Sequence, residues 1–191
     1  MSRIQLWNGD ICELEVDAIV SPANPTLWMS TGVGQALKAA AGEEVEFAAI
    51  RQAPVSLGDA IVTPAGRLAA RLVIHAVSLD RDRRTSGPAI ETAVRSVFAL
   101  AREHDVTSLA LPALGTGVGG FPMDEAARIA VATVRAELRR SPAIGSVTFA
   151  LRGLDAYAAF ERALTAPVGL DIVADGTPAG DGIRPVHGVP A

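Results

Sequence analysis

Cysteine, histidine and lysine, which supply much of the reactive chemistry of proteins, are scarce in this sequence. Cys12 is the only cysteine and Lys38 the only lysine among 191 residues. A lone cysteine excludes a disulfide within the chain and fits a reducing, cytoplasmic environment. The three histidines are scattered, and their spacing matches no metal-binding pattern. We therefore expect neither a disulfide nor a bound metal ion, and nothing points to another cofactor.

An excess of positive charge and long apolar runs are also missing. The formal net charge of −4 argues against a nucleic-acid-binding surface that works through bulk electrostatics. No run of about 18 apolar residues and no charged leader with an apolar core occurs, so we expect neither a membrane span nor a signal peptide. Hydrophobic residues make up 49% of the chain and aromatic residues only 4%, which predicts an aliphatic core. The dominance of arginine over lysine, with abundant alanine, suggests a bacterial source.

Short aliphatic segments alternate with segments of helical periodicity. Six segments are typical of strands: Ile4–Trp7, Ala18–Ser21, Asp59–Thr63, Leu72–Val77, Ser108–Ala113 and Ser146–Leu151. This alternation predicts an α/β sandwich with a largely parallel sheet. After residue 166 the composition shifts to glycine, proline and aspartate without periodicity. We expect one domain over residues 1–166 and a flexible tail over residues 167–191.

The most informative stretch runs from Leu111 to Pro122 and reads LPALGTGVGGFP. It follows an apolar strand segment, and Pro122 stands where a helix would begin. A glycine-rich turn between a strand and a helix leaves several backbone N–H groups unpaired in the positive field of the helix. Such a turn suits an anion, most often a phosphate. A tight turn whose glycines only relieve crowding is the alternative.

Two familiar phosphate motifs do not explain this stretch. A P-loop needs lysine and serine or threonine after its glycines, where this chain has Phe121 and Pro122. Gly115, Gly117 and Gly120 satisfy the dinucleotide spacing GxGxxG. That fingerprint also needs a second strand ending in an acid about 20 residues later, and none is present. A dinucleotide-dependent oxidoreductase is therefore poorly supported.

Two further segments could contact the same ligand. A strand ends at Ser21, Asn24 follows it, and a helix starts near Gly32, so a second helix N-terminus is available for a pyrophosphate. Asp10 comes directly after the first strand. Its carboxylate can accept a hydrogen bond from an exocyclic amine such as adenine N6, or it can serve as a turn residue or helix cap.

In this order the three segments resemble the macrodomain, the ADP-ribose-binding module, over roughly residues 3 to 165. The resemblance rests on Gly9-Asp10-Ile11, on SPAN before a glycine-containing loop where the family has NAAN, and on GTGVGGFP. The segments IVTPAG at 61–66 and VIHA at 73–76 also match. The resemblance implies a three-layer αβα sandwich with a mixed, mostly parallel central sheet of about six strands.

The resemblance also implies roles for individual residues. Asp10 would accept from adenine N6, and Ile11 would line the adenine pocket and donate its backbone N–H. Arg152 falls near the place of an aromatic that stacks on adenine, and its guanidinium can stack in its stead. Asn24 would bond the distal ribose hydroxyls. The remaining predicted contacts, to the phosphates and distal ribose, are Gly32 and Val33 from the first loop and Gly115, Thr116, Gly117, Val118 and Gly119 from the second.

The chain departs from the family pattern at several of these positions. Ser21 and Pro22 replace the first Asn-Ala of NAAN, and residues 29–31 make the ribose loop bulkier. Gly34 stands where MacroD-type hydrolases carry an aspartate. Gly119 replaces an aromatic that often packs against the distal ribose. The predicted function is binding of ADP-ribose, free or attached to a protein; the alternative is a slow ADP-ribosyl hydrolase or O-acetyl-ADP-ribose deacetylase in which Asn24 is the catalytic residue.

Other conspicuous residues have simpler interpretations. His75 matches the family, but a lone histidine in an aliphatic strand is more often structural. The run Arg81–Arg84 predicts an exposed loop without a binding role. Trp7 and Trp28 fit either the core or the rim of a site.

Overall fold

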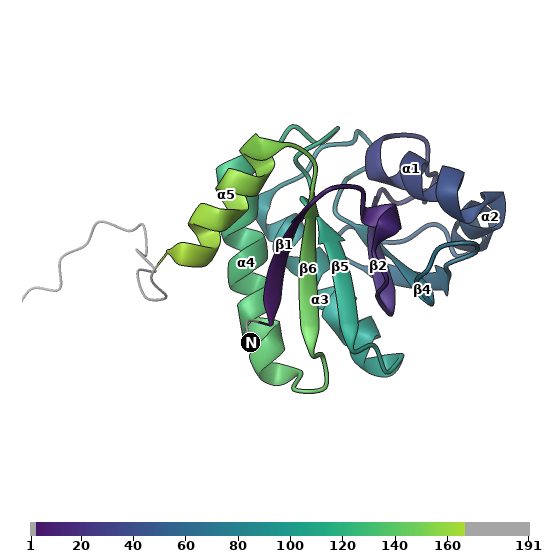
Figure 1. The fold of residues 1–191 in the computed structure, drawn as a ribbon. Coiled ribbons are helices and arrows are strands. Elements are labelled where there is room, and N and C mark those ends of the chain that lie inside the picture. Colours follow the sequence, from purple (N-terminus) through teal and green to yellow (C-terminus); the bar gives the residue numbers. More distant parts are fainter. Residues whose placement is uncertain (1–2, 167–191) are drawn as a thin grey trace, which may run out of the picture.

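The computed structural model describes residues 3–166, which form a sheet and the helices that cover it (Figure 1). The strands are β1 (Ile4–Asn8), β2 (Ala18–Ala23), β3 (Ala60–Pro64), β4 (Leu72–Val77), β5 (Ser108–Pro112) and β6 (Ser146–Leu151). The helices are the 3-10 turn η1 (Ile11–Glu13), α1 (Gly32–Ala41), α2 (Glu43–Ile50), α3 (Gly87–Glu103), α4 (Met123–Arg140) and α5 (Leu154–Thr165). The predicted tail, residues 167–191, lies outside the described residues. Over the described part, no helix has both the length and the apolarity needed to cross a membrane.

The sheet has the strand order β1-β6-β5-β2-β4-β3. Every neighbouring pair is parallel except β3 and β4, which are antiparallel. The prediction of a mixed, mostly parallel six-stranded sheet is confirmed. Because parallel strands point the same way, the loops that leave β1, β2, β4, β5 and β6 meet at one edge of the sheet.

Helices cover both faces of the sheet, as the three-layer prediction requires. In Figure 1, α1 and α2 lie on one side, and α4 and α5 on the other. Alternate residues of β2 show the division: Ala18 and Val20 belong to the core under α3, α4 and α5, whereas Ile19 belongs to the core under α1 and α2. This alternation follows from the two-residue period of a strand.

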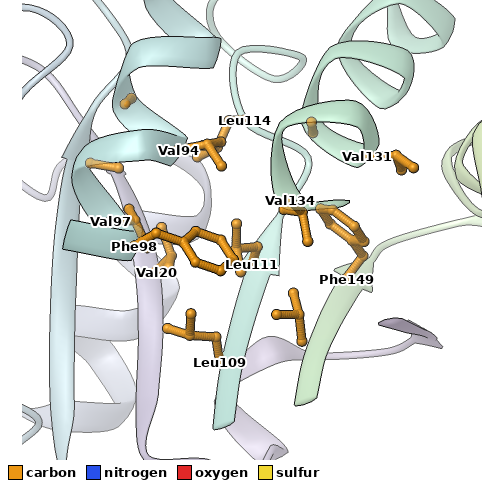
Figure 2. Close-up of a cluster of buried hydrophobic side chains, with 14 of the residues drawn as sticks. Val20, Val94, Val97, Phe98, Leu109, Leu111, Leu114, Val131, Val134 and Phe149 are labelled. Carbon is orange, nitrogen blue, oxygen red and sulfur yellow. The ribbon is translucent and has the colours of Figure 1, made fainter. Parts of the chain in front are cut away.

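The larger core is mainly aliphatic, in agreement with the low aromatic content. Figure 2 shows Phe98 of α3 and Val134 of α4 over Leu109 and Leu111 of β5, with Phe149 of β6 beside them. These side chains are fully buried. Burial of this kind stabilises by about 1.5–3 kcal/mol for each large apolar side chain. The strand ends that carry the site loops are therefore held on a close-packed platform.

Helix α2 is the element that periodicity does not predict. Gly42, with φ of +113°, separates it from α1, and such a φ favours glycine. Its first turn is acidic, with Glu43, Glu44 and Glu46, and it shows no amphipathic period. Acidic side chains in the first turn stabilise a helix through its dipole, so this helix depends on charge more than on an apolar stripe.

His75 lies in the middle of β4 and is fully buried. Its Nε2 lies 2.9 Å from the hydroxyl of Thr63 on β3, and its Nδ1 has no partner among the described residues. Burial lowers the pKa of the imidazole from 6.5 to about 4. The ring is therefore neutral at pH 7, and its hydrogen-bond partner is a residue of the neighbouring strand, which supports the structural interpretation.

We predict that His75 makes the fold sensitive to acid. Its folded pKa lies below its unfolded pKa, so the unfolded state binds more protons between these two values, and stability falls as the pH is lowered from about 6.5 to about 4. Urea denaturation should show that His75 accounts for about 2 kcal/mol of the unfolding free energy lost between pH 7.5 and 4.5. His75→Gln, which cannot take up this proton, should lose correspondingly less. An equal acid-induced loss in both proteins would contradict the prediction.

Candidate functional site

A cleft opens at the carboxyl edge of the sheet, between the loops that follow β2, β4 and β5. The chain leaves β2 toward α1 on one face of the sheet and leaves β5 toward α4 on the other, although the two strands are neighbours. Such a switch point is where open α/β sheets bind ligands. The cleft is lined by residues 22–24 and 28–34, by Leu79 and Arg83, and by residues 113, 115 and 117–119.

The cleft exists because β2 and β5 pair only at their beginnings. The paired residues are Ala18 with Leu109 and Ile19 with Ala110. Farther along, Pro22 in β2 and Pro112 in β5 lack the backbone N–H that a ladder bond requires. The two strands can therefore separate toward their carboxyl ends, where the loops begin.

Asp17 links β2 and β5 by hydrogen bonds at their amino ends, away from the cleft. Its Oδ2 accepts from the backbone N–H and the hydroxyl of Thr107, both at 2.7 Å, and from the N–H of Ser108 at 3.1 Å. The N–H of Asp17 donates in return to Oγ of Ser108 at 2.8 Å. The hydrogen bond from the Thr107 hydroxyl is the main cause that lowers the pKa of this carboxyl. β2 and β5 are thus hydrogen-bonded to each other at their amino ends and separate at their carboxyl ends.

Asn24 begins the first loop and has one half of its amide free for a ligand. Its Oδ1 accepts from the N–H of Thr26 at 3.0 Å and from the Thr26 hydroxyl at 2.7 Å. Two donors on one side identify that atom as the oxygen and leave Nδ2 as a donor. Nδ2 has no acceptor among the described residues, and Asn24 lines the cleft. The predicted bond to a ribose hydroxyl is therefore chemically available.

The N-terminus of α1 presents unpaired donors to the same cleft. The first helical bond runs from the N–H of Gln35 to the carbonyl of Thr31 at 3.2 Å, so the N–H groups of Gly32, Val33 and Gly34 have no acceptor within the helix. The side chain of Thr31, the N-cap residue, makes no capping bond. The positive end of the helix dipole therefore stays open to an anion.

The second loop brings a matching row of backbone donors. It is folded on itself by bonds from the N–H of Gly120 to the carbonyl of Gly117, and from the N–H of Phe121 to the carbonyl of Gly115. The N–H groups of residues 117–119 stay outside this pattern and line the cleft. Helix α4 begins just beyond, with Pro122 at its N-cap as the sequence predicts. Thr116 is the exception, because its hydroxyl donates back to Ala113 and it does not line the cleft.

Two glycines of this loop are required by space. A Cβ on Gly115 would approach Ile90 and Thr85 to 2.9 Å, and the φ of Gly115 is +80°. A Cβ on Gly119 would lie 2.6 Å from the carbonyl oxygen of Gly115. An aromatic residue therefore cannot occupy position 119 in this loop conformation, which is the physical reason for that departure from the family pattern.

Asp10 and Arg152 lie together beyond the cleft, at the ends of β1 and β6. Asp10 caps η1 by accepting from the N–H of Cys12 at 3.0 Å, and its other oxygen lies 3.0 Å from Nη2 of Arg152. The bond from Cys12 is the main cause that lowers the pKa of Asp10, so the carboxylate is ionised at neutral pH. The helix-cap interpretation of Asp10 is therefore right. The cap uses only Oδ1, so Oδ2 can exchange its bond with Arg152 for a bond with another donor. Ile11 is buried beneath them.

Arg83, Leu79 and Trp28 also line the cleft, and sequence reasoning assigned none of them to it. The run Arg81–Arg84 is exposed as predicted, but Arg83, with φ of +62°, lies at the cleft. No ion pair to Arg83 exists within residues 3–166. Trp28 is a rim residue, with 56% of its surface exposed. They belong to the loops that follow β2 and β4, and those strands end at the same edge of the sheet, which is the signal that a sequence offers.

Comparisons with known proteins agree with this geometry. The Macro domain family model matches residues 20–130, which is more than half of the chain. An uncharacterized protein of Mycobacterium tuberculosis is 40% identical over 166 residues, which make up 87% of this chain and 46% of that protein. The chain thus spans about half the length of the first curated relatives it matches. An O-acetyl-ADP-ribose deacetylase of Salmonella gallinarum is 40% identical over 139 residues, covering 70% of this chain and 78% of that enzyme.

Solved structures show the same architecture. A Trypanosoma brucei macrodomain in complex with ADP-ribose gives a TM-score of 0.79 at 28% identity, covering 85% of this chain and 69% of that one. An Oceanobacillus iheyensis macrodomain with ADP gives 0.76 at 27% identity, covering 83% and 88%. A mostly parallel sheet of this order, with helices on both faces and a cleft at its switch point, defines a three-layer α/β domain. The chain belongs to the macrodomain family.

Proposed function

We propose that residues 1–166 form a macrodomain that binds ADP-ribose, free or attached to a protein. The observation that carries this proposal is the pair of facing loops with unpaired backbone N–H groups, at residues 32–34 and 117–119. Two rows of donors on opposite walls suit the two linked phosphates of a pyrophosphate. The similar T. brucei macrodomain, solved with ADP-ribose, supports the choice of ligand.

Asn24 in the cleft and the Asp10–Arg152 pair beyond it suit the rest of the ligand. Asp10 is ionised and can accept from the adenine amine through Oδ2, while the released Arg152 can stack on the base. Asn24 can donate to the distal ribose through Nδ2, beside Trp28 and Arg83. The site therefore recognises both ends of ADP-ribose with side chains and its centre with backbone.

Calorimetric titration with ADP-ribose, run beside AMP and NAD, tests the proposal. Hydrogen bonds to charged groups contribute about 1.5–3 kcal/mol each, so a few of them reach the roughly −8 kcal/mol of micromolar binding. We expect ADP-ribose to bind in the micromolar range and more tightly than AMP. Absence of heat and of a thermal shift at millimolar ADP-ribose would reject the proposed function.

Replacing Asp10 should weaken binding without unfolding the protein. Asp10→Ala removes the acceptor for the adenine amine and should cost about 1.5–3 kcal/mol of binding free energy. Asp10→Asn is the matched control, because its amide oxygen can still cap η1 at the N–H of Cys12 while its NH₂ cannot accept from adenine. We expect both variants to lose affinity in calorimetry. Parent-like binding by Asp10→Asn would assign Asp10 to capping alone.

Arg83 should contribute to affinity through its charge. Arg83→Ala should weaken ADP-ribose binding about two- to tenfold, on the scale of exposed charged contacts. Because salt screens such contacts, the affinity of the variant should also depend less on sodium chloride concentration. Arg81→Ala makes the same change in net charge within the same loop but away from the cleft. Equal effects of the two substitutions would show that only overall charge matters.

A second candidate function is slow hydrolysis of an ADP-ribosyl or O-acetyl ester, which the similarity to a named O-acetyl-ADP-ribose deacetylase favours. In such a reaction a water oxygen bonds to the ester carbonyl carbon, the bond from that carbon to the ribose oxygen breaks, and the ribose oxygen takes up a proton from the water while the acid is released. Asn24 would orient the ribose, and the loop of residues 115–119 would hold the phosphate beside the water. Gly34 supplies no carboxylate, so a positioned base, typically worth about 10²–10⁴-fold, is absent at that place.

Substitutions at Asn24 and Gly34 test this candidate through release of ADP-ribose from a protein modified on glutamate. Asn24→Asp keeps the oxygen that holds Thr26 but loses the N–H donor, so it and Asn24→Ala should both abolish turnover. A Cβ on Gly34 makes only ordinary contacts, at 3.6–3.7 Å to Met29 and Ser21. Gly34→Asp should therefore be tolerated and raise the rate by up to about 10²-fold. Parent turnover that survives both Asn24 changes contradicts the mechanism, and no turnover in any variant leaves a binding module.

We also propose a cytoplasmic location in a bacterium. The half-buried Cys12 is unpaired, which suits a reducing compartment. Curated relatives from Salmonella and Mycobacterium support the bacterial source.

A further inference from the structure

Glu46 is a buried carboxylate on α2 whose contacts reach beyond its own helix. Only 4% of its surface is exposed. Its Oε1 accepts from the backbone N–H of Met29 at 2.8 Å. Both of its oxygens also face Nζ of Lys38 on α1, at 3.1 and 3.3 Å. One side chain thus joins α1, α2 and the loop that leads from β2 into the cleft.

The backbone N–H of Met29 lies in a buried part of its loop, so it needs a hydrogen-bond acceptor, which Glu46 supplies. Residues 25–31 contain no glycine, and Met29 is 4% exposed in the smaller core. A buried N–H without a partner is costly, so without Glu46 this segment would move toward water. Glu46 therefore favours the observed path of the loop over alternatives.

The same segment holds a strained residue directly before Trp28. Leu27 is buried with φ of +61°, a conformation that a branched side chain rarely adopts. The segment is fixed on its near side by bonds from Leu27 to the carbonyl of Asn24, and from Val55 to the carbonyl of Pro25. Glu46 fixes its far side, at Met29. Trp28, which lines the cleft, lies between these two anchor points.

Lys38 sets the position of the carboxylate. The ammonium group is partly exposed, with 29% of the side chain in solvent, whereas the Glu46 side chain has 5%. Pairing with this cation offsets the cost of burying the Glu46 charge. The carboxylate is then oriented from one side by α1 and can hold Met29 on the other.

We propose that Glu46 is a positioning residue for the end of the cleft that receives the distal ribose. It touches no ligand; it fixes Met29 and thereby places Trp28 and the stretch up to the N-terminus of α1. Gly34 packs beside Met29, and Lys38 of α1 pairs with Glu46, but the phosphate-facing N–H groups of residues 32–34 are fixed by the helix itself, so we expect them to be disturbed less than the loop. This inference rests on the proposed binding of ADP-ribose and adds a residue that acts through the loop.

The test compares ADP-ribose with ADP, which has the same adenine and phosphates but no distal ribose. Glu46→Ala should weaken ADP-ribose binding about tenfold or more, since a misplaced loop loses oriented contacts, and should change ADP binding less than about threefold. Glu46→Gln keeps an oxygen that can accept from Met29 and should bind ADP-ribose nearly as the parent does. Glu44→Ala, an exposed acid on the same helix, should leave both affinities unchanged.

The pattern of losses separates positioning from general stability. Equal weakening of ADP and ADP-ribose by Glu46→Ala, or no weakening of either, overturns the proposal. Amide exchange of Met29 provides a readout that needs no ligand: we expect slow exchange in the parent and Glu46→Gln, and fast exchange in Glu46→Ala. Unchanged exchange in Glu46→Ala also overturns it. If the parent binds no ADP-ribose, the proposed function fails, while Met29 exchange still reports separately on the anchor.

Discussion

The short pairing of β2 with β5 is the contact on which the site depends. Asp17 ties the beginnings of these strands to each other through Thr107 and Ser108, and Pro22 and Pro112 cannot donate to a ladder farther along. The strands are therefore neighbours at one end and separate at the other. Since the chain leaves them toward opposite faces of the sheet, the N-terminus of α1 and the glycine loop before α4 come to line the same opening.

In the proposed complex, recognition of the phosphates is mainly a property of the backbone. The donors at residues 32–34 and 117–119 are peptide N–H groups held by helix and turn geometry, so they need no side chain to rearrange when a phosphate binds. Such donors stabilise a bound anion but supply no proton acceptor. Gly34 adds no carboxylate to the wall formed by the N-terminus of α1. In the proposed complex, side chains contribute through Asp10, Arg152, Asn24 and Arg83.

Features encoded locally could be predicted from the sequence. The strands and the helix start at Pro122 follow from short-range patterns, and the phosphate-type loops follow from glycine between a strand and a helix. Glu46 could not be predicted as an anchor, because its contact with Met29 joins residues 17 positions apart and depends on how α2 packs. The exposure of Arg83 could be predicted from the charged run around it. Its place at the cleft could not, because that depends on β4 lying next to β2.

The bulkier first loop and the glycine at position 119 can be understood together. The Met29 side chain packs in the smaller core, and its backbone N–H donates to Glu46. These two contacts order the loop, whereas glycines in their place would leave it more flexible. On the opposite wall, Gly119 lies so close to the Gly115 carbonyl that no side chain fits. One wall is thus filled and fixed by Met29, while the second loop has no side chain at positions 117 and 119. A cleft with both walls ordered before binding loses less entropy when the ligand arrives, which favours affinity.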